Sequence, residues 1–407
     1  MTSPRTVLIS GASVSGPALA YWLHRAGFAV TVVEKAGAPR GGGYPVDIRG
    51  TATEVVRRMG LWPRLRQAHV APRHATFLDA AGRTVASLRA RADEGEPRDL
   101  EIRRGDLADA LHGLVRDDVE FVFGDSVSAF DPAAHGVDVT FRSGRQGTYD
   151  LVIGADGVHS ATRAALFGPE DRYHHYLGHC FALFTLPDPA GLDRELVLWN
   201  TPGKAAALYA TGDGAEVHGF LTFHRPEPPR AALRDPDAQR ELVAQVFAGE
   251  GWEIPRMVAA LREAGDLFFD TAGQIRMPRW TSGRAALVGD AAHAPSFLTG
   301  QGTSLALSGA YVLARALAAH RDHAAAFAAY EDRMRPYVTA NQALVDEGGA
   351  TLFPVTAHAL EQRDARLRAL DALPPARSRP AHTALTLPHD DGCPAPSSGA
   401  TRARPVR

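Results

Sequence analysis

The sequence has few cysteines, few lysines and no long apolar run. Its 407 residues include two cysteines, Cys180 and Cys393, too few and too far apart for a disulfide scaffold or a four-ligand zinc site. No stretch reaches the roughly 20 apolar residues that cross a bilayer. The N-terminus lacks the basic region and cleavage site of a signal peptide. These absences predict a cytoplasmic protein without a membrane span.

Charge is balanced, with 44 Lys and Arg residues against 46 Asp and Glu residues and a formal net charge of −2. A nucleic-acid or anionic-membrane surface needs clustered basic side chains, and the sequence has no such cluster. His174, His175 and His179 have no cysteine or carboxylate cluster near them at metal-ligand spacing. We therefore expect no nucleic-acid partner and no metal.

Residues 5–34 have the pattern of a strand, a Gly-rich turn, a helix and a second strand. Thr6 to Ser10 is apolar and β-branched, Pro17 to Ala26 carries apolar residues at helical spacing, and Val30 to Val33 is again apolar. Gly27 is suited to end the helix. The pattern predicts the start of a parallel βαβ unit and hence an α/β fold with a Rossmann-like domain.

The first turn fits a dinucleotide-binding fingerprint in which Ser13 replaces the usual middle glycine. Backbone amides at a helix start bind pyrophosphate, which requires a tight turn without bulky side chains. Glu34 closes the second strand, where an acid can hold a ribose hydroxyl. The alternative is an ordinary tight turn. We predict that a dinucleotide contacts Gly11, Ala12, Ser13, Ser15, Gly16 and Glu34.

Two further predicted strands end on glycine and are followed by an aspartate. Asp150 to Gly154 precedes Asp156, and Ala285 to Gly289 precedes Asp290. An acid beside free helix-start amides suits a ribose or ribitol chain and the carbonyl edge of a flavin. Asp156 can also be explained as the N-cap of the helix after it. The second aspartate is followed by a Gly-rich helix start, Gly300, Gln301 and Gly302.

In this order and spacing, the three motifs resemble those of FAD-dependent aromatic hydroxylases of the para-hydroxybenzoate hydroxylase type, which include the tetracycline-inactivating monooxygenases. The resemblance covers about residues 5–345. It implies that Gly11–Gly16 holds the FAD pyrophosphate, Glu34 the adenosine ribose and Asp290 the ribityl or ribose hydroxyls. It places the pyrimidine edge of the ring against Gly300, Gln301 and Gly302.

The resemblance extends to several other positions. Arg104 is similar to the arginine of an R-x-x-L motif that faces FAD, and Val127 to the position whose backbone meets adenine. Asp156 would serve FAD and the nicotinamide cofactor together. The stretch Gly42–Gly50 resembles the loop beside the isoalloxazine ring. The reductant would be NADH or NADPH, which must dock transiently because the sequence carries one dinucleotide fingerprint.

One position departs from the family pattern. Relatives usually have a proline four residues after the position of His293, near the reactive edge of the flavin, whereas this chain has Phe297 there and Pro295 two residues earlier. Two interpretations follow. The substitution alters the chemistry at that edge, or a loop tolerates it without effect.

The strand-rich stretch 171–275 lacks the βαβ rhythm and is predicted to be inserted into the first domain. We expect a discontinuous FAD-binding domain (1–70, 100–170 and 276–345) and a substrate domain (71–99 and 171–275). C-terminal helices would end in a short helical piece over 346–373. From residue 374 the Pro- and Ser-rich composition predicts a disordered tail to residue 407.

The predicted activity is that of an FAD monooxygenase. NAD(P)H and O₂ would hydroxylate or epoxidise a small organic molecule, aromatic or polycyclic and of the secondary-metabolite type, through a flavin C4a-hydroperoxide. No general base is identified by the sequence. Two alternatives stay open: an FAD-bound catalyst of cyclisation or rearrangement without redox chemistry, and a non-enzymatic flavin-binding module.

Overall fold

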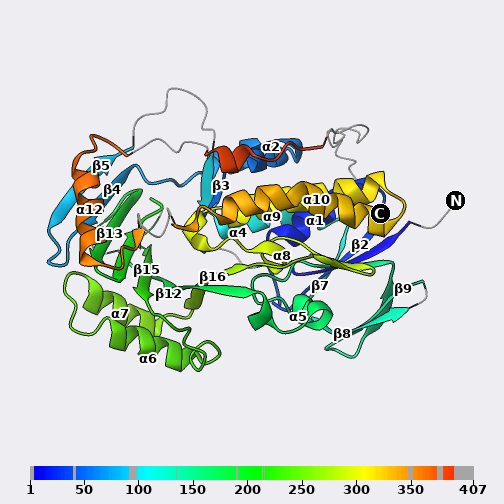
Figure 1. Cartoon of the computed structure of the whole chain (residues 1–407), viewed down its shortest axis with the longest axis horizontal. Coiled ribbons are helices and arrows are strands. Elements are labelled where there is room, and N and C mark those ends of the chain that lie inside the picture. The colour runs from blue at the N-terminus through cyan, green and yellow to red at the C-terminus, as the bar shows by residue number, and fades with distance from the viewer. Residues whose placement is uncertain are drawn as a thin grey trace, which may run out of the picture.

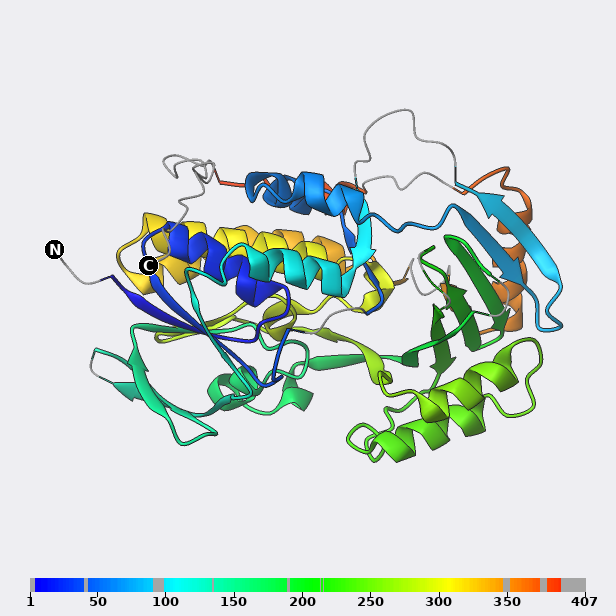
Figure 2. The same ribbon diagram turned by 180° about the vertical axis from the view of Figure 1, so that it is seen from behind.

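The computed structural model describes residues 4–39, 43–90, 99–133, 135–188, 191–212, 214, 216–346, 352–373 and 379–388. Two large β-sheets organise these residues, one mainly parallel and one mainly antiparallel. Figures 1 and 2 show the parallel sheet with its helices at one end of an elongated molecule and the second sheet at the other. Strands β12 (His174–Pro187) and β16 (Phe268–Ile275) run between the two ends.

The parallel sheet has six strands in the order β17-β18-β11-β1-β2-β7, and only the edge strand β17 is antiparallel to its neighbour. Its central strands are continuous apolar runs because both faces are covered, and Val7, Leu8 and Ile9 are fully buried. The strands are β1 (Thr6–Ser10), β2 (Ala29–Glu34), β7 (Glu120–Phe123), β11 (Leu151–Gly154), β17 (Thr281–Ser282) and β18 (Ala285–Leu287).

Helices cover one face of this sheet, and a small antiparallel sheet covers the other (Figures 1 and 2). Val7 and Ile9 pack with the helices, whereas Leu8 and Val33 pack with the small sheet, as alternation along a strand requires. The covering elements are α1 (Ser15–Arg25), α4 (Arg104–Gly113), α9 (Gly302–Ala319) and α10 (His323–Gln342) on one face, and α5 (Ala161–Phe167), β8 (Val127–Ala133), β9 (Gly136–Phe141) and β10 (Gln146–Tyr149) on the other.

The second sheet has seven strands in the order β16-β12-β15-β14-β13-β4-β5. Neighbouring strands are antiparallel except β13 and β4, which run parallel although more than 100 residues separate them. The remaining strands are β4 (His74–Leu78), β5 (Thr84–Arg89), β13 (Glu195–Thr201), β14 (Lys204–Tyr209) and β15 (Glu216–His224).

The two faces of the seven-stranded sheet pack against different partners. One face packs against α6 (Pro236–Val246) and α7 (Ile254–Glu263), and its buried rings include Phe184, Trp199 and Phe223. The opposite face carries Phe181 and Phe220, which point toward the parallel-sheet end and contact Phe297 there. This second face is therefore the one that meets the Gly-rich turns.

The remaining elements join the two ends. Strands β3 and β6 form an antiparallel ribbon whose β3 strand contacts α9, and α12 packs on β5 (Figures 1 and 2). No helix in the described ranges is long and apolar enough to span a membrane. These elements are β3 (Pro45–Ile48), β6 (Leu100–Arg103), α2 (Thr51–Arg58), α3 (Trp62–Gln67), α8 (Asp290–His293) and α12 (Ala357–Arg368), with 3₁₀ turns η1 (Glu170–Arg172), η2 (Phe297–Thr299) and η3 (Pro380–Thr383).

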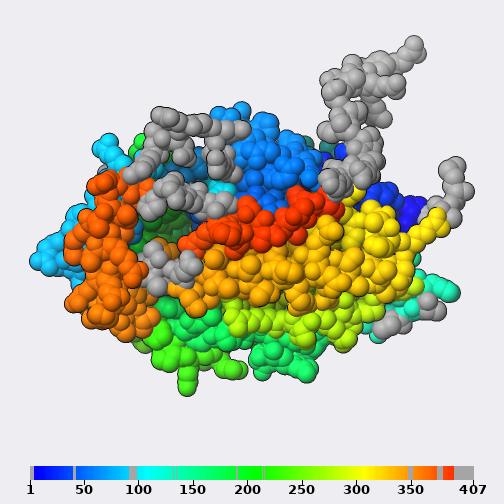
Figure 3. Space-filling view, turned by 45° about the horizontal axis from the view of Figure 1, so that its top comes forward, coloured from blue at the N-terminus to red at the C-terminus, as the bar shows by residue number. Residues whose placement is uncertain are grey.

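The predicted disorder from residue 374 onward is wrong for residues 379–388. This segment, red in Figures 1 and 3, lies along α2 and α10, and its residues His382, Leu385 and Leu387 are buried. Thr51 Oγ1 donates to the Leu385 carbonyl at 2.9 Å, and the Asn341 amide donates to the Ala381 carbonyl at 2.9 Å. Composition missed this docking because helix side chains bind the segment's backbone. Residues 374–378 and 389–407 lie outside the described residues.

Truncation tests the docked segment. A chain ending at residue 378 should melt several degrees below the full-length protein, because full burial of one leucine contributes roughly 1.5–3 kcal/mol and two are lost here. A chain ending at residue 388 is the control and should melt close to the full-length protein. Thermal denaturation followed by circular dichroism measures both. Equal melting temperatures for the two truncations would show that the docked segment contributes nothing.

Candidate functional site

The three Gly-rich turns meet at the carboxyl edge of the parallel sheet. Gly11 has φ of +109°, and a Cβ there would collide with the Ala155 carbonyl. A Cβ on Gly289 would collide with the hydroxyl of Ser15. The Ala155 amide donates to the Ser10 carbonyl at 2.8 Å. Segments that lie more than 100 residues apart along the chain are thus packed too closely for any side chain larger than hydrogen at these two glycines.

The N-terminus of α1 is open to an anion. No side chain of the described residues caps it, and its first turn contains no acidic residue. The first amides of a helix lack intrahelical acceptors and carry the positive end of the helix dipole. Gly16 lies at this end, and a Cβ there would collide with the Gly11 carbonyl. This tight, uncapped turn fits a pyrophosphate, as the sequence predicts.

Arg104 lies at the same turn although it comes from α4. Its guanidinium donates to Ser13 Oγ at 2.9 Å, and its backbone amide donates to the Tyr44 carbonyl at 3.1 Å. The arginine thereby connects the first turn to the stretch that precedes β3. A cation at this position adds to the positive potential of the helix N-terminus.

The carboxylate of Glu34, at the end of β2, accepts hydrogen bonds from the backbone around it. One carboxylate oxygen accepts from the Ala12 amide and the other from the Ala36 amide, each at 2.9 Å. The Gly124 amide donates to the Ala36 carbonyl at 2.9 Å, which brings the turn before Val127 to the same edge. The carboxylate therefore holds the Gly-rich turn in shape, and its contact with a ribose stays a prediction.

Asp156 makes its hydrogen bonds inside its own turn. One carboxylate oxygen accepts from the Ser160 hydroxyl, and the other accepts from the amide and the hydroxyl of Thr162, at 2.9 and 3.0 Å. These contacts fit the capping role, although Ser160 rather than Asp156 is the N-cap residue of α5. The role of Asp156 toward two cofactors stays a prediction.

His159, in the same turn, ties it to the second sheet. Its Nδ1 is 2.9 Å from Glu170 Oε1 and its Nε2 is 3.0 Å from Asp270 Oδ2 on β16. Hydrogen bonds to Asp270 and Glu170 raise the pKa of His159 to about 10. The imidazolium is therefore charged at neutral pH and bridges the two ends of the molecule.

Asp290 and the helix start of α9 form the third part of the site. Asp290 is the first residue of α8, and burial raises its pKa while the Arg104 cation opposes that shift. A Cβ on Gly302 would lie 3.8 Å from Asp290 Oδ1, so the two motif residues are neighbours. Gln301 is fully buried, and its side-chain oxygen has no partner among the described residues. This acceptor fits an N–H group of a bound molecule.

The residue between Pro295 and Phe297 has a backbone conformation that L-residues rarely adopt. Ser296 between them has φ of +77° and ψ of 147° and is buried, which costs of order 1–3 kcal/mol. The Pro295 carbonyl accepts from the Gln274 amide at 3.0 Å. The turn aims the Phe297 ring at the second sheet, away from the core of its own domain.

Phe297 is part of a cluster of aromatic rings on the face of the seven-stranded sheet that points toward the parallel-sheet end, and we call this cluster the aromatic wall. Its ring centroid lies 4.5 Å from that of Phe181, and Phe181 lies 5.8 Å from Phe268. Tyr44 stacks on Phe268 at 6.5 Å. The aromatic wall consists of Tyr44, Phe181, Phe220, Phe268, Phe297 and Phe353.

The β3–β6 ribbon presents charged residues beside this wall. Asp47 and Glu101 are directly opposite each other across the ribbon, and Asp47 is paired with Arg49 at 2.8 Å. A Cβ on Gly300 would lie 2.8 Å from Asp47 Oδ2. The ribbon therefore contacts the loop that the sequence assigns to the flavin's pyrimidine edge.

Two kinds of site residue were missed by sequence reasoning. Phe181, Phe268 and Phe353 were not singled out by any sequence motif, and their neighbours Phe184, Trp199 and Phe223 lie on the helix-covered face instead. The alternation of side chains along β12 could have identified the face on which each ring lies, because Cys180 and Phe184 share one face and Phe181 lies on the other. The sequence around Glu101 gives no indication of a functional role, since the residues that surround Glu101 in the fold come from strands distant in sequence.

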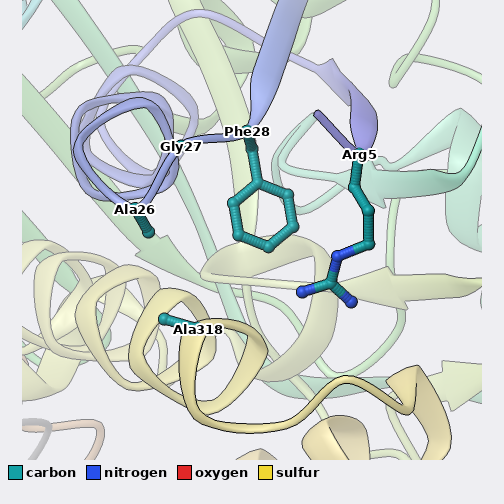
Figure 4. A pocket seen from close by; sticks show the side chains of 5 residues that line it. All are labelled: Arg5, Ala26, Gly27, Phe28 and Ala318. Atoms are coloured by element: carbon teal, nitrogen blue, oxygen red, sulfur yellow. The ribbon is translucent and has the colours of Figure 1, made fainter. Parts of the chain in front are cut away.

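Surface hollows elsewhere differ in character. Figure 3 shows the surface hollowed between α12 and the 379–388 segment, with green strands of the second sheet at its floor. A dent of about 110 Å³ is lined by Arg5 and Phe28 among others (Figure 4), and the Arg5 guanidinium lies 4.5 Å from the Phe28 ring centroid. Because Arg5 donates there to carbonyls at the end of α9, this dent is explained by helix capping. In the described ranges, no group of three or more His, Cys, Asp and Glu is placed to hold a metal.

Comparisons with known proteins agree with this geometry. A family model described as an FAD binding domain matches residues 5–344. A flavin-dependent monooxygenase from an unknown prokaryotic organism is 36% identical over 370 residues, which cover 89% of this chain and 95% of that protein.

Solved structures are similar over nearly the whole chain. Tetracycline destructase Tet(55) has a TM-score of 0.82 and 35% identity, with 96% of this chain and 100% of that chain covered. HpxO of Klebsiella pneumoniae, complexed with FAD, has a TM-score of 0.72 at 22% identity, over 90% of this chain and 95% of that one, and so supports the fold alone. The chain belongs to the FAD-binding family of flavin-dependent monooxygenases.

Proposed function

We propose that this monooxygenase uses NADH or NADPH and O₂ to hydroxylate or epoxidise an aromatic or polycyclic small molecule. The observation that carries the proposal is that the aromatic wall meets the third cofactor-type turn, which itself packs against the first. Phe297 comes from the third motif and contacts Phe181 of the second sheet. A flat apolar substrate seated on this wall would lie next to the ring system that the turns are built to hold.

The residues present fit FAD. The uncapped α1 turn with Ser13 and Arg104 would hold the pyrophosphate, and Asp290 would accept from the ribityl or ribose hydroxyls. The buried oxygen of Gln301, which lacks a partner among the described residues, would accept from the pyrimidine edge. In this proposal Val127, Glu34 and Asp156 keep the roles that the family pattern gives them.

When bound, the flavin supplies the activation of O₂ and the transfer of one oxygen atom. The chain's own residues orient the substrate and exclude water. Phe181, Phe220 and Phe353 surround the Phe297 ring at 4.5–5.9 Å between centroids. This apolar packing would keep water away from the ring system that the turns would hold. Because FAD would occupy the one fingerprint, the nicotinamide cofactor would dock only transiently.

An aromatic substrate is supported by an exposed ring. Phe268 is 41% exposed, although Tyr44 and Phe181 contact it at 6.5 and 5.8 Å. A large apolar side chain exposed beside a cofactor-type turn is typical of a binding surface. Tet(55) is named for a polycyclic substrate class, tetracyclines, and rings of that size suit a wall built from six aromatic side chains.

Absorbance tests the proposal. The purified protein should be yellow, bleach when NADH or NADPH is added without oxygen, and regain its colour in air. Faster NAD(P)H consumption with tetracycline, together with a product heavier by one oxygen atom, would support the substrate class. A protein that binds FAD but is never reduced would indicate the non-redox catalyst, and one that takes up no FAD would indicate a different function.

Replacement of Asp290 with alanine should weaken FAD binding about tenfold or more, because the hydroxyls it serves lose a buried acceptor worth roughly 1–3 kcal/mol. Titration of the FAD-free protein with FAD measures the affinity. Because burial disfavours the carboxylate, the FAD-free D290A protein should melt no lower than the parent. Asp290→Asn, which keeps one acceptor, should be intermediate. Parental FAD affinity in D290A would contradict the assignment.

Replacement of Phe297 should change the ratio of product formed to NAD(P)H consumed, while FAD affinity stays close to the parent. Phe297→Pro restores the usual family residue and removes the ring from the aromatic wall, and Phe297→Leu removes the ring alone. If the ring matters, both variants release more peroxide.

Phe184→Leu is the matched control because Phe184 lies on the opposite, helix-covered face of the same sheet. Its ratio should equal that of the parent. An unchanged ratio in both Phe297 variants would identify Phe297 as a neutral loop residue.

A further inference from the structure

A surface cleft of about 390 Å³ lies between helix α10 and the chain that leaves β16. Arg335, Val338 and Gln342 line it from one face of α10, since they follow one another at helical spacing. Residues of the segment 275–280 line the other side, and His293 at the end of α8 joins them. Sites for small molecules have volumes of about 300–1,000 Å³, so the cleft is large enough for a ligand.

The buried side chains that line the cleft are mainly apolar. Met277, Trp280 and Val338 are buried, and the Trp280 ring lies 4.8 Å from the ring of His293, centroid to centroid. His293 is also buried, and among the described residues its Nδ1 has no hydrogen-bond partner outside its own residue. Burial lowers the pKa of His293 to about 3, and the Arg335 cation adds to this shift. The imidazole is therefore neutral and adds no charge to the cleft.

Hydrogen bonds join the two sides of the cleft. The Gln342 amide donates to the Ile275 carbonyl at 2.9 Å and to the Ala294 carbonyl at 3.2 Å. The Arg335 guanidinium donates to the Met277 carbonyl at 3.1 Å. The cleft is thus preformed, which limits the entropy that is lost when a ligand binds.

Both charged residues that line the cleft are cations. Arg335 is paired with Glu331 at 2.7 Å, and the other oxygen of Glu331 accepts from a backbone amide and a threonine hydroxyl. Arg276 is exposed, and its guanidinium donates twice to the neutral side-chain oxygen of Gln274, at 2.9 and 2.6 Å. Within the described ranges, no carboxylate is paired with Arg276. The positive charge that a ligand would meet is therefore that of Arg276.

We propose that this cleft binds a small aromatic carboxylate, with its ring against Trp280 and Val338 and its carboxylate on Arg276. A guanidinium bonded to a neutral amide oxygen can still form charge-assisted hydrogen bonds with a carboxylate. An inorganic anion would leave the apolar surface uncovered, and a neutral ring would leave the cation without a partner. The cleft shares no lining residue with the aromatic wall or with the predicted FAD contacts, so this site is separate from that of the proposed function.

Equilibrium dialysis against the FAD-loaded protein tests the site with 2-naphthoate and its neutral isostere, 2-naphthamide. The parent should bind naphthoate with a Kd below about 1 mM. It should bind naphthamide about tenfold more weakly, because the amide loses the charge-assisted hydrogen bonds to Arg276. Arg276→Gln should remove this preference, and Arg276→Lys, which keeps the charge, should retain part of it.

Arg279→Gln is the matched control, because Arg279 is also exposed and three residues further along but does not line the cleft. It should keep the parental preference. Thr339→Trp, at an exposed lining position of α10, should weaken naphthoate binding by filling the cleft. These substitutions change exposed side chains and should leave the melting temperature close to that of the parent. Phe297→Leu, in the aromatic wall, should leave naphthoate binding unchanged.

Three results would overturn the inference. They are a preference for naphthoate that survives in Arg276→Gln, the absence of this preference from the parent, and a loss of naphthoate binding in Phe297→Leu with no change in Thr339→Trp. The last result would place naphthoate on the aromatic wall. Naphthoate bound at the cleft of a protein that NAD(P)H cannot reduce would reject the proposed function alone. A reducible protein without the preference would reject the cleft site alone.

Discussion

The close approach of the Gly11 and Gly289 backbones to their neighbours at the carboxyl edge of the parallel sheet, the Ala155 backbone for the first and the Ser15 side chain for the second, is the constraint on which the rest depends. Gly11 against Ala155 and Gly289 against Ser15 leave no room for a Cβ. A side chain at either glycine would push β1, β11 and β18 out of parallel register or tilt α1 from the edge. The amides at the α1 N-terminus can then no longer converge with Asp290 and Gln301. The same close packing therefore determines both the fold and the shape of the cofactor site.

This part of the molecule was predictable from sequence because its information is local. A buried strand, a small-residue turn and an amphipathic helix lie within 30 residues. The connection between two parallel strands is almost always right-handed, so these elements can be arranged in only one way. The same holds for the strands before Asp156 and Asp290. What the local pattern could not supply is the use that the backbone makes of Glu34, which holds the Ala12 and Ala36 amides. The contacts of Asp156 within its own turn were among the alternatives that the sequence offered, because a short polar side chain serves the nearest backbone donor first.

The second sheet and the C-terminal segment were less predictable because they depend on long-range pairing. The parallel pairing of β4 with β13 and the docking of residues 379–388 join segments that no short motif relates. Aromatic residues could be found in the sequence, yet the face on which each lies depends on register. Phe181 and Phe184 differ by three positions, and that odd spacing alone places them on opposite sides of the sheet. Composition likewise predicted disorder for a segment whose carbonyls, rather than its side chains, make many of its contacts.

The β3–β6 ribbon shows how one register fixes both stability and chemistry. A slip of one residue would turn Val46 and Ile102 toward the second sheet and drive Asp47 and Glu101 into the apolar core, where unpaired carboxylates cost several kcal/mol. The register is held at its ends, where the Arg104 amide donates to the Tyr44 carbonyl and the Gly50 amide to Asp99. Hydrophobic burial on one face therefore sets the position of the charges on the other. The same burial that folds the ribbon places Asp47 at the Gly300 loop and Glu101 at Tyr209, so apolar side chains on one face of the ribbon align the Gly300 loop with the second sheet.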